Sequence, residues 1–214
     1  DITNGLISNQ IKSIDFDEDG TVWVGTNSGV SFYNGTSWDS YSDANSDLHW
    51  SGVNATDFSS NGDKWFASPL GGITHFDGSN FINYDDSDGL ISKYSTDLLI
   101  DDQNNKWIGT ASGISVLSAT NVNVINYTKM YLLPPPDTLN PVVDLEIDNW
   151  GRIWVGIYVG YLSEGGVAYW NGDVWLDLDI QDGLAGSNIK DLSIDSNNNI
   201  WIATTSGISK VITQ

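Results

Sequence analysis

Apolar and polar residues alternate along this chain in short runs, and turn-forming residues separate the runs. Residues 11–16 and 189–194 are two such runs, and each leads into a turn rich in Asp, Asn and Gly. Alternation with a period of two is typical of β-strands. No segment carries an apolar stripe of period 3.6 that is long enough for a helix. The pattern therefore predicts an all-β chain.

The strand pattern is repeated five times. Successive repeats are 42, 42, 47 and 47 residues apart, measured from one tryptophan of the repeat to the next. A tryptophan follows a polar turn in each copy: Trp23, Trp65, Trp107, Trp154 and Trp201. A glycine followed by Val or Ile comes next: Gly29-Val30, Gly72-Ile73, Gly113-Ile114, Gly166-Val167 and Gly207-Ile208. A coincidence of two registers in five copies indicates an internal structural repeat.

Each repeat is predicted to form four strands, which we call a to d in chain order. Strand b carries the tryptophan, and turns such as Asn34-Gly35 and Asp77-Gly78 separate strands c and d. Repeats of about 42 residues with four strands suit the blades of a β-propeller. We expect one domain over residues 1–214, a five-bladed propeller of four-stranded antiparallel blades. The expected blades are about 5–46, 47–88, 89–139, 140–182, and 183–214 together with 1–4.

The two ends of the chain predict how the ring of blades is closed. Residues 1–6 match residues 179–184, which lie at the end of a strand d, and the chain stops just after a strand c. The fifth blade is therefore expected to be incomplete and to be closed near the N-terminus by a short strand. The alternative is a piece of a longer propeller, cut between strands.

Composition narrows the possible partners. The chain holds 28 acidic and 8 basic residues, giving a formal charge of −20, and it contains no cysteine. Such a negative field disfavours nucleic acid and anionic membrane surfaces, and the missing thiols exclude disulfides and zinc–thiolate sites. No run of about 18 apolar residues occurs, so membrane insertion is not expected.

The repeat resembles a known family. The text Asp-x-x-Gly-x-x-Trp-x-Gly-Thr, followed by Ser-Gly-Val/Ile, is similar to the two-component regulator propeller repeat, and the resemblance covers nearly the whole chain. The match is closest at Asp17, Gly20, Trp23, Gly25, Thr26 and Gly29, and at Trp107, Gly109, Thr110 and Gly113. The resemblance implies an extracytoplasmic sensor or secreted module of bacteria, often responsive to carbohydrates. The motif implies no catalytic residues.

Acidic residues of strand a form the first candidate site. In a propeller, strand a lies innermost, so these carboxylates should crowd the axial channel, where a cation such as calcium is one way to offset their repulsion. Water, backbone donors or protonation are the other ways. The predicted axial carboxylates are Asp15, Asp57, Asp97, Asp144, Glu146 and Asp191.

Irregular loops form the second candidate site. Both departures from the 42-residue spacing fall in connections that should share one face, at 130–141 between blades and at 157–165 between strands b and c. Loops on a rigid scaffold commonly carry binding residues. The predicted ligand-binding residues of this face are His49, Trp50, Tyr94, Tyr131, Tyr158 and Tyr161.

These features favour a non-catalytic, extracytoplasmic (periplasmic or secreted) recognition module for a glycan or another small polar ligand. Two alternatives stay open. One is a polysaccharide-active enzyme, either a five-bladed glycoside hydrolase or a lyase, although no acid and nucleophile pair stands out among the axial carboxylates. The other is a structural scaffold whose incomplete blade offers an edge strand to a protein partner.

Overall fold

A computed structural model describes all residues except 51, 131–139, 161, 163 and 214. The described residues form five antiparallel sheets, which we call blades 1 to 5 in chain order. In each sheet the strands lie in the order of the sequence, so every blade is a simple meander. This confirms the predicted repeat of all-β units.

The first three blades have four strands each. Blade 1 contains β1 (Ile11–Phe16), β2 (Val22–Thr26), β3 (Gly29–Tyr33) and β4 (Trp38–Tyr41). Blade 2 contains β5 (Ala55–Phe58), β6 (Lys64–Ser68), β7 (Gly72–Phe76) and β8 (Phe81–Tyr84). Blade 3 contains β9 (Ser95–Ile100), β10 (Lys106–Thr110), β11 (Gly113–Leu117) and β12 (Val124–Tyr127).

Blade 4 has four strands and blade 5 has three. Blade 4 contains β13 (Val142–Ile147), β14 (Ile153–Val159), β15 (Glu164–Trp170) and β16 (Trp175–Leu178). Blade 5 contains β17 (Ile189–Ile194), β18 (Ile200–Thr204) and β19 (Gly207–Val211). Two 3-10 helices, η1 (Ile2–Asn4) and η2 (Asp86–Asp88), lie outside the sheets.

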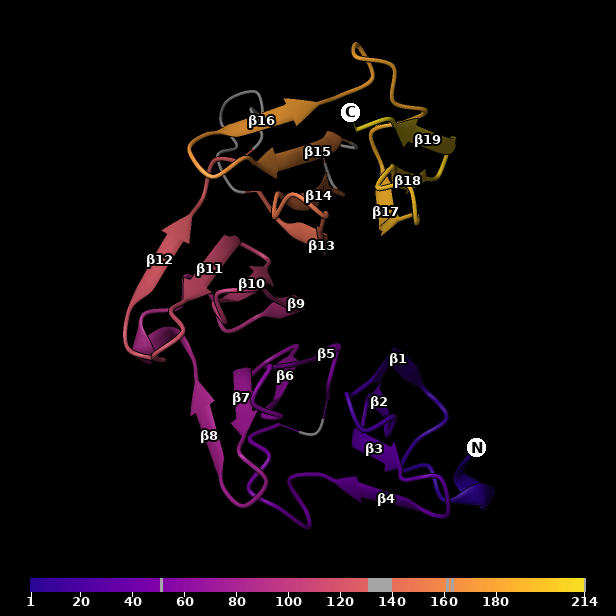
Figure 1. The fold of residues 1–214 in the computed structure, drawn as a ribbon, viewed down its shortest axis with the longest axis vertical. Coiled ribbons are helices and arrows are strands. Elements are labelled where there is room, and N and C mark those ends of the chain that lie inside the picture. Colours follow the sequence, from indigo (N-terminus) through magenta and orange to yellow (C-terminus); the bar gives the residue numbers. More distant parts are fainter. Residues whose placement is uncertain (51, 131–139, 161, 163, 214) are drawn as a thin grey trace.

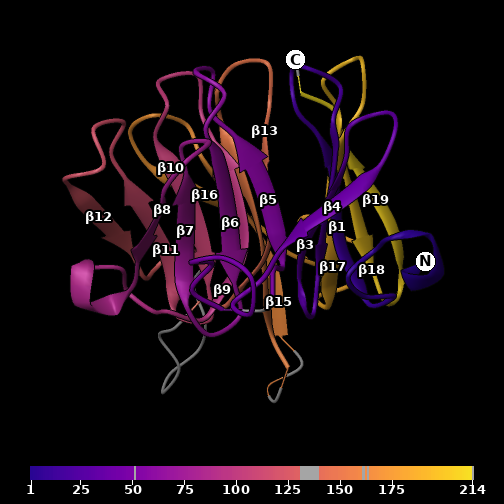
Figure 2. The same ribbon diagram turned by 90° about the horizontal axis from the view of Figure 1, so that it is seen from below.

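The blades are arranged around a common axis as in a β-propeller, with strand a of each blade innermost (Figure 1). β1, β5, β9, β13 and β17 neighbour one another in that order around the axis. Because β13 pairs with β14 in antiparallel register, Val142 opposite Ile157, the start of strand a and the end of strand b lie at the same face. We call this the connector face, and the opposite one, with the a–b and c–d turns, the turn face (Figure 2).

Buried apolar clusters join neighbouring blades. Trp154 and Val167 of blade 4, for example, pack with Ile189 and Leu192 of blade 5. Three further clusters join blades 1 and 2, 2 and 3, and 3 and 4 in the same way. The repeated tryptophans of blades 1 to 4 are therefore interblade core residues, with exposed fractions of 7% or less. Burial of such large rings is the main source of stability in this arrangement.

The acidic turn residues before each tryptophan cap the a–b hairpins. In blade 3, the Asp101 carboxylate accepts hydrogen bonds from the backbone N–H groups of Gln103 and Asn105 and from the Trp107 indole N–H, the last over 2.9 Å. Blade 2 has Ser59 in this register, and its hydroxyl oxygen accepts the Trp65 indole N–H. These residues act as Asx-type turn caps that also satisfy a buried indole.

The predicted closure of blade 5 near the N-terminus is not observed. Ile2–Asn4 form η1, stabilised by the Asp1 carboxylate that accepts the Thr3 N–H, and β19 is an edge strand. In Figure 1, β1–β4 and β17–β19 lie on the two sides of an open stretch of the ring. No apolar cluster of the described residues joins blade 5 to blade 1. The similarity of residues 1–6 to residues 179–184 predicts a short closing strand, but residues 2–4 form a 3-10 helix that joins no sheet.

Candidate functional site

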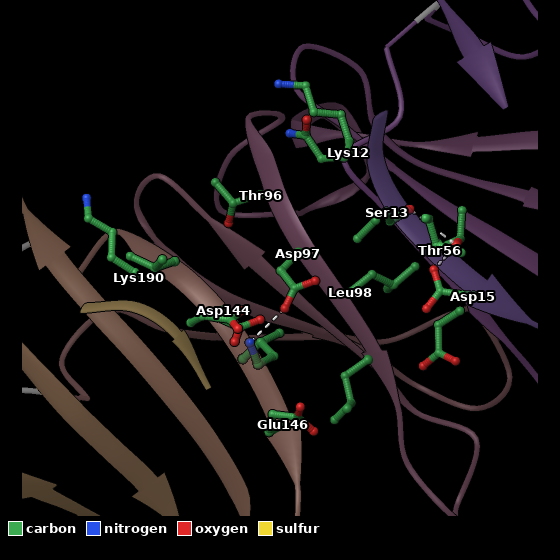
Figure 3. Close-up of a pocket in the computed structure, with 18 residues that line it drawn as sticks. Lys12, Ser13, Asp15, Thr56, Thr96, Asp97, Leu98, Asp144, Glu146 and Lys190 are labelled. Atoms are coloured by element: carbon green, nitrogen blue, oxygen red, sulfur yellow. Dashed lines mark hydrogen bonds between the residues drawn. The ribbon is translucent and has the colours of Figure 1, made fainter. Parts of the chain in front are cut away.

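A polar cavity of about 530 Å³ lies on the propeller axis. All six predicted axial carboxylates line it, as strand a of each blade contributes side chains. Figure 3 shows Lys12, Thr96 and Lys190 toward one end of this axial cavity and Asp15 and Glu146 toward the other. The fold places the six acids at the axis because they occupy two registers of the innermost strand, two and four residues before the turn position, which face the same side.

Most of these carboxylates hold neighbouring blades together. Asp57 accepts the backbone N–H of Ile100 over 2.6 Å, and Asp97 accepts that of Leu145 over 2.7 Å. Asp144 accepts the N–H of Leu192 in the same way, and Asp15 accepts the hydroxyl of Thr56. Each of these four aspartates therefore bonds to strand a of the following blade. Backbone donors are one of the ways of offsetting the repulsion between the axial carboxylates that the sequence analysis names, and these hydrogen bonds provide it.

Burial raises the pKa of several carboxyl groups of the cavity. Burial raises the pKa of Asp57 and Asp144 to about 6 each. Burial, and then the neighbouring Asp144 charge, raise the pKa of Asp97 well above its ordinary value. Burial also raises the pKa of Glu146 to about 7, with contributions from nearby carboxylates. Like charges in a poorly solvated channel avoid one another by binding protons.

Glu146 differs from the other buried acids of the cavity. No hydrogen-bond partner of its side chain is found among the described residues, whereas Asp15, Asp57, Asp97 and Asp144 accept backbone or hydroxyl hydrogens. The Glu146 carboxyl group therefore lines the cavity without a hydrogen bond to the described residues, so it is available to contact a ligand.

The axial cation stays a prediction. Among the described residues, no three His, Asp or Glu side chains converge closely enough to hold a metal ion. The aspartates point their oxygens at neighbouring strands, which uses coordination sites that calcium would need. The residues present do not fit a metal centre well.

The connector-face rim of the cavity was not foreseen from the sequence. The residue five positions before the turn acid lines the cavity in every blade. These rim residues are Lys12, Asn54, Thr96, Val143 and Lys190.

A β-bulge explains the rim. The register of strand a shifts between Ile11 and Ser13 in blade 1 and between Ile189 and Asp191 in blade 5. The extra residue, Lys12 or Lys190, is thereby aimed at the channel together with its neighbour, which strict alternation forbids. Equivalent shifts occur in blades 3 and 4. The residue type five positions before the turn is the sign of this rim in the sequence. Strict alternation along strand a predicts that this residue faces away from the cavity, so the sign is missed.

Four of the six predicted ligand-binding residues lie in the described part of the chain. Tyr131 and Tyr161 are outside the described residues. Tyr158, at the end of β14, has the Lys190 amine 5.4 Å from its ring centre, so it stands beside the cavity rim. His49 is exposed, and its charge contributes to a lowered pKa of Asp85, after the stronger effect of hydrogen bonds from Ser87.

Trp50 and Tyr94 gather around one b–c turn of the connector face. The Trp50 ring covers Gly71 so closely that an added Cβ there would lie 2.0 Å from the ring, and the ring stays 43% exposed. The N–H of Gly72 donates to the carbonyl of Lys93, directly before Tyr94, which is 49% exposed. The Trp50 ring and the backbone next to Tyr94 therefore contact the same turn. Tyr158 lies apart, on blade 4.

The sequence profile described as "Two component regulator propeller" matches residues 5–28 and 183–206. Each match spans a connector, strand a, the turn acid and the tryptophan, which are the elements that build the axial cavity and the interblade core. These two segments are therefore similar to two-component regulator propeller repeats. No curated protein sequence matches it.

Solved structures show the same fold for these propeller repeats. The extracellular domain of BT3049, assigned to the hybrid two-component systems of B. thetaiotaomicron, aligns with a TM-score of 0.78 and 18% identity over 94% of this chain and 27% of its own length. The extracellular domain of BT4673 from B. thetaiotaomicron, assigned to the one-component systems, aligns with a TM-score of 0.74 and 18% identity. This alignment covers 95% of this chain and 27% of that domain. This chain therefore spans about a quarter of the length of these domains.

An enzyme has a similar fold as well. A catalytically inactive virginiamycin B lyase from Staphylococcus aureus, solved with quinupristin, aligns with a TM-score of 0.69 and 15% identity over 98% of this chain and 72% of its own. Likeness at this level of identity concerns the fold alone. In the described residues, no helix is long and apolar enough to cross a membrane.

Proposed function

We propose that this propeller is a non-catalytic, extracytoplasmic recognition module that binds a carbohydrate or another polar ligand on its connector face. The observation that carries the proposal is the axial cavity, whose rim offers two amines, an amide and a hydroxyl from four blades. The exposed rings of Trp50 and Tyr94 lie outside the cavity lining, at a b–c turn of the same face. Hydroxyl-rich ligands need such convergent donors and acceptors, together with flat apolar surfaces for stacking.

The similarity to extracellular domains of two-component systems supports the extracytoplasmic part of the proposal. A net charge of −20 makes a neutral or cationic ligand a better match than an anionic one at long range. Lys12 and Lys190 moderate this field at the rim, so one carboxylate or sulfate group on a sugar is tolerated there.

Replacing Trp50 by alanine should weaken binding of the recognised glycan at least about tenfold, as is usual for an exposed aromatic anchor at an interface. Titration calorimetry with a panel of neutral and acidic oligosaccharides measures the effect. Trp150→Ala is the matched control, because this tryptophan is also exposed (53%) but lies in the a–b turn of blade 4, on the turn face. Equal affinities of wild type and Trp50→Ala would move the site elsewhere, and equal losses in both variants would contradict the proposed face.

A polysaccharide-active enzyme is the second candidate, and Glu146 favours it. A carboxylic acid with a pKa of about 7 and no structural hydrogen bond is suited to general acid or base catalysis near neutral pH. Reducing-end and unsaturated-uronate assays on a polysaccharide panel test this candidate. Activity that is lost in Glu146→Gln and kept in Glu18→Gln, an exposed residue of an a–b turn, would replace the recognition proposal by an enzymatic one.

A further inference from the structure

Blade 3 differs from the other blades in the residue that lies opposite the repeat tryptophan, on strand c. Antiparallel pairing places this residue directly beside the tryptophan in every blade. In blades 1, 2 and 4 its ring stacks on the indole, with ring centroids 4.8, 4.4 and 4.5 Å apart. In blade 5 a lysine amine lies 5.0 Å from the indole centroid. The residues at this register are Phe32, His75, Val116, Tyr169 and Lys210.

Val116 of blade 3 is too small to cover its tryptophan in this way. A cavity of about 190 Å³ lies against Val116 and Trp107 instead, between blades 3 and 4. Its lining includes Asn105 of the a–b turn and Ser118 of the c–d turn, so it lies at the turn face. An apolar cavity of about 150 Å³ is large enough to hold benzene. This cavity, which we call the blade 3–4 pocket, therefore has room for one aromatic ring.

Aromatic side chains from both blades line the blade 3–4 pocket. They are Trp107 and Tyr127 of blade 3 and Trp170 of blade 4. The Tyr127 ring is nearly parallel to the Trp107 indole, at 4° and a centroid separation of 6.1 Å, and its centroid lies 5.4 Å from that of Trp170. Aromatic groups attract one another in such offset and tilted arrangements. A flat ring is therefore the ligand shape that these side chains favour.

Asn105 supplies a hydrogen-bond acceptor at the edge of the pocket. It lies two positions before the tryptophan, where blade 2 has Asp63, and the Asp63 carboxylate is hydrogen-bonded to Nε2 of the stacked His75 over 2.8 Å. Asn105 Nδ2 donates to both carboxylate oxygens of Asp101, whereas Asn105 Oδ1 accepts a single hydrogen bond, from the Ala119 N–H. A carbonyl oxygen has two lone pairs. A ring beside Trp107 would thus meet an acceptor, so it needs a donor on its own edge.

The charge around the pocket disfavours an anionic ligand. The Asp101 carboxylate lies directly behind Asn105, and the whole chain has a formal charge of −20. Among the described residues that line the pocket there is no lysine or arginine. A negative ligand would be repelled without compensation, so the aromatic ligand should be uncharged.

We propose that the blade 3–4 pocket binds a small molecule with one uncharged aromatic ring that carries a hydrogen-bond donor, such as a phenol. The ring lies against Trp107, where blades 1, 2 and 4 place a ring of their own, and the hydroxyl donates to Asn105 Oδ1. The pocket belongs to the turn face, whereas the recognition proposed above uses the connector face. The two sites are therefore separate, and each is tested without the other.

Titration of the isotopically labelled chain with para-cresol, followed through the tryptophan indole N–H resonances, tests the proposal. The Trp107 and Trp170 resonances should shift in a saturable way, with the millimolar affinity expected of a ligand of this size. The resonances of Trp23 and Trp154 should stay in place, because rings of their own blades already cover these indoles. No saturable shift at Trp107, or shifts of equal size at all four resonances, would overturn the proposal.

Val116→Phe should lower the affinity for para-cresol at least about tenfold, because a well-packed interface has no room for both the new ring and the ligand. Lys210→Phe is the matched control, since it places the same ring at the same register of blade 5 and should leave the affinity unchanged. Far-UV circular dichroism checks that both variants fold. Equal affinities of the wild-type chain and a folded Val116→Phe variant would overturn the proposal.

A comparison of ligands tests the pocket in the wild-type chain and depends on no variant. para-Methylanisole, which has a methyl group in place of the hydroxyl hydrogen, should bind at least about fivefold more weakly than para-cresol, because it offers no donor to Asn105. para-Toluate, which carries a carboxylate, should also bind more weakly than para-cresol. Equal affinities of all three ligands would contradict the proposal. Tighter binding of N-acetyltyrosinamide than of para-cresol would overturn it in favour of a tyrosine side chain of a protein partner.

Discussion

Alanine in place of Trp154 should lower the free energy of unfolding by about 3–5 kcal/mol, whereas alanine in place of Trp201 should lower it by no more than about 1 kcal/mol. Trp154 is 1% exposed, packs between blades 4 and 5, and donates its indole N–H to Asp148 over 2.9 Å. Trp201 makes the equivalent bond to Asp195 over 3.0 Å, but no blade covers its ring.

The comparison isolates the contribution of the interblade contact, because the two residues share a register and an indole hydrogen bond. Urea unfolding followed by far-UV circular dichroism measures both variants. Equal destabilisation of the 214-residue chain by both substitutions would show that the ring of Trp201 is already covered.

Raising the pH should destabilise the chain through its axial carboxyl groups. The pKa of Glu146 is about 7 in the folded chain and near 4.3 in an unfolded one, so the folded state binds more protons between these values. Stability from this group is complete below pH 4 and is lost as the pH rises through 7. Asp57 and Asp144, each with a pKa of about 6, act in the same direction.

Glu146→Gln should therefore stabilise the chain at pH 8 by on the order of 2 kcal/mol and leave it unchanged at pH 4, as one unit of pKa corresponds to about 1.4 kcal/mol. Gln removes the charge and breaks no hydrogen bond of the described residues. Urea unfolding at pH 4, 6 and 8 measures the effect, with Glu18→Gln as the exposed control. An equal effect of Glu146→Gln at all three pH values would show that the cavity does not retain protons.

Acid conditions should act through different residues. Hydrogen bonds from Asn199, and then from the Trp201 indole, lower the pKa of Asp195, and the turn acids Asp17 and Asp148 are also shifted downward despite their burial. The contribution of these turn acids to the stability of the folded state is present above the unfolded pKa of about 4 and is lost as the pH falls below that value. The pKa values of the turn acids are lowered and those of the axial acids are raised. The free energy of unfolding should therefore be greatest near pH 4 to 5.

Much of the candidate site follows from the repeat. Once strand a is placed innermost, the registers of Asp57, Asp97 and Asp144 determine that they face the axis. What they bind there does not follow, because the N–H groups that they accept belong to other blades, 43 to 48 residues away. A cation was one sequence-based expectation for this charge and stays a prediction; the structure shows interblade hydrogen bonds to these three aspartates and raised pKa values of Asp57 and Asp144.

Local periodicity also limits what can be predicted at the connector face. Lys12 and Lys190 reach the cavity through β-bulges, which depend on how two strands pair and leave no mark in the alternation. The proximity of Trp50 and Tyr94 depends on a bond between two blades, from the Gly72 N–H to the Lys93 carbonyl.

The sequence by itself determined that this protein consists of repeated four-stranded units, because the tryptophan, the turn acid and the Gly-Val/Ile pair are local features of a single chain segment. It also determined which side chains each unit offers to its two neighbours. Only the tertiary structure decided whether those neighbours are present. The match of residues 1–6 to the end of a strand d predicted a closed fifth blade, whereas Trp201, Ile208, Ile11 and Ile14 are exposed. Ring closure depends on how blades are oriented around the axis, which is a property of the whole arrangement and not of any one repeat.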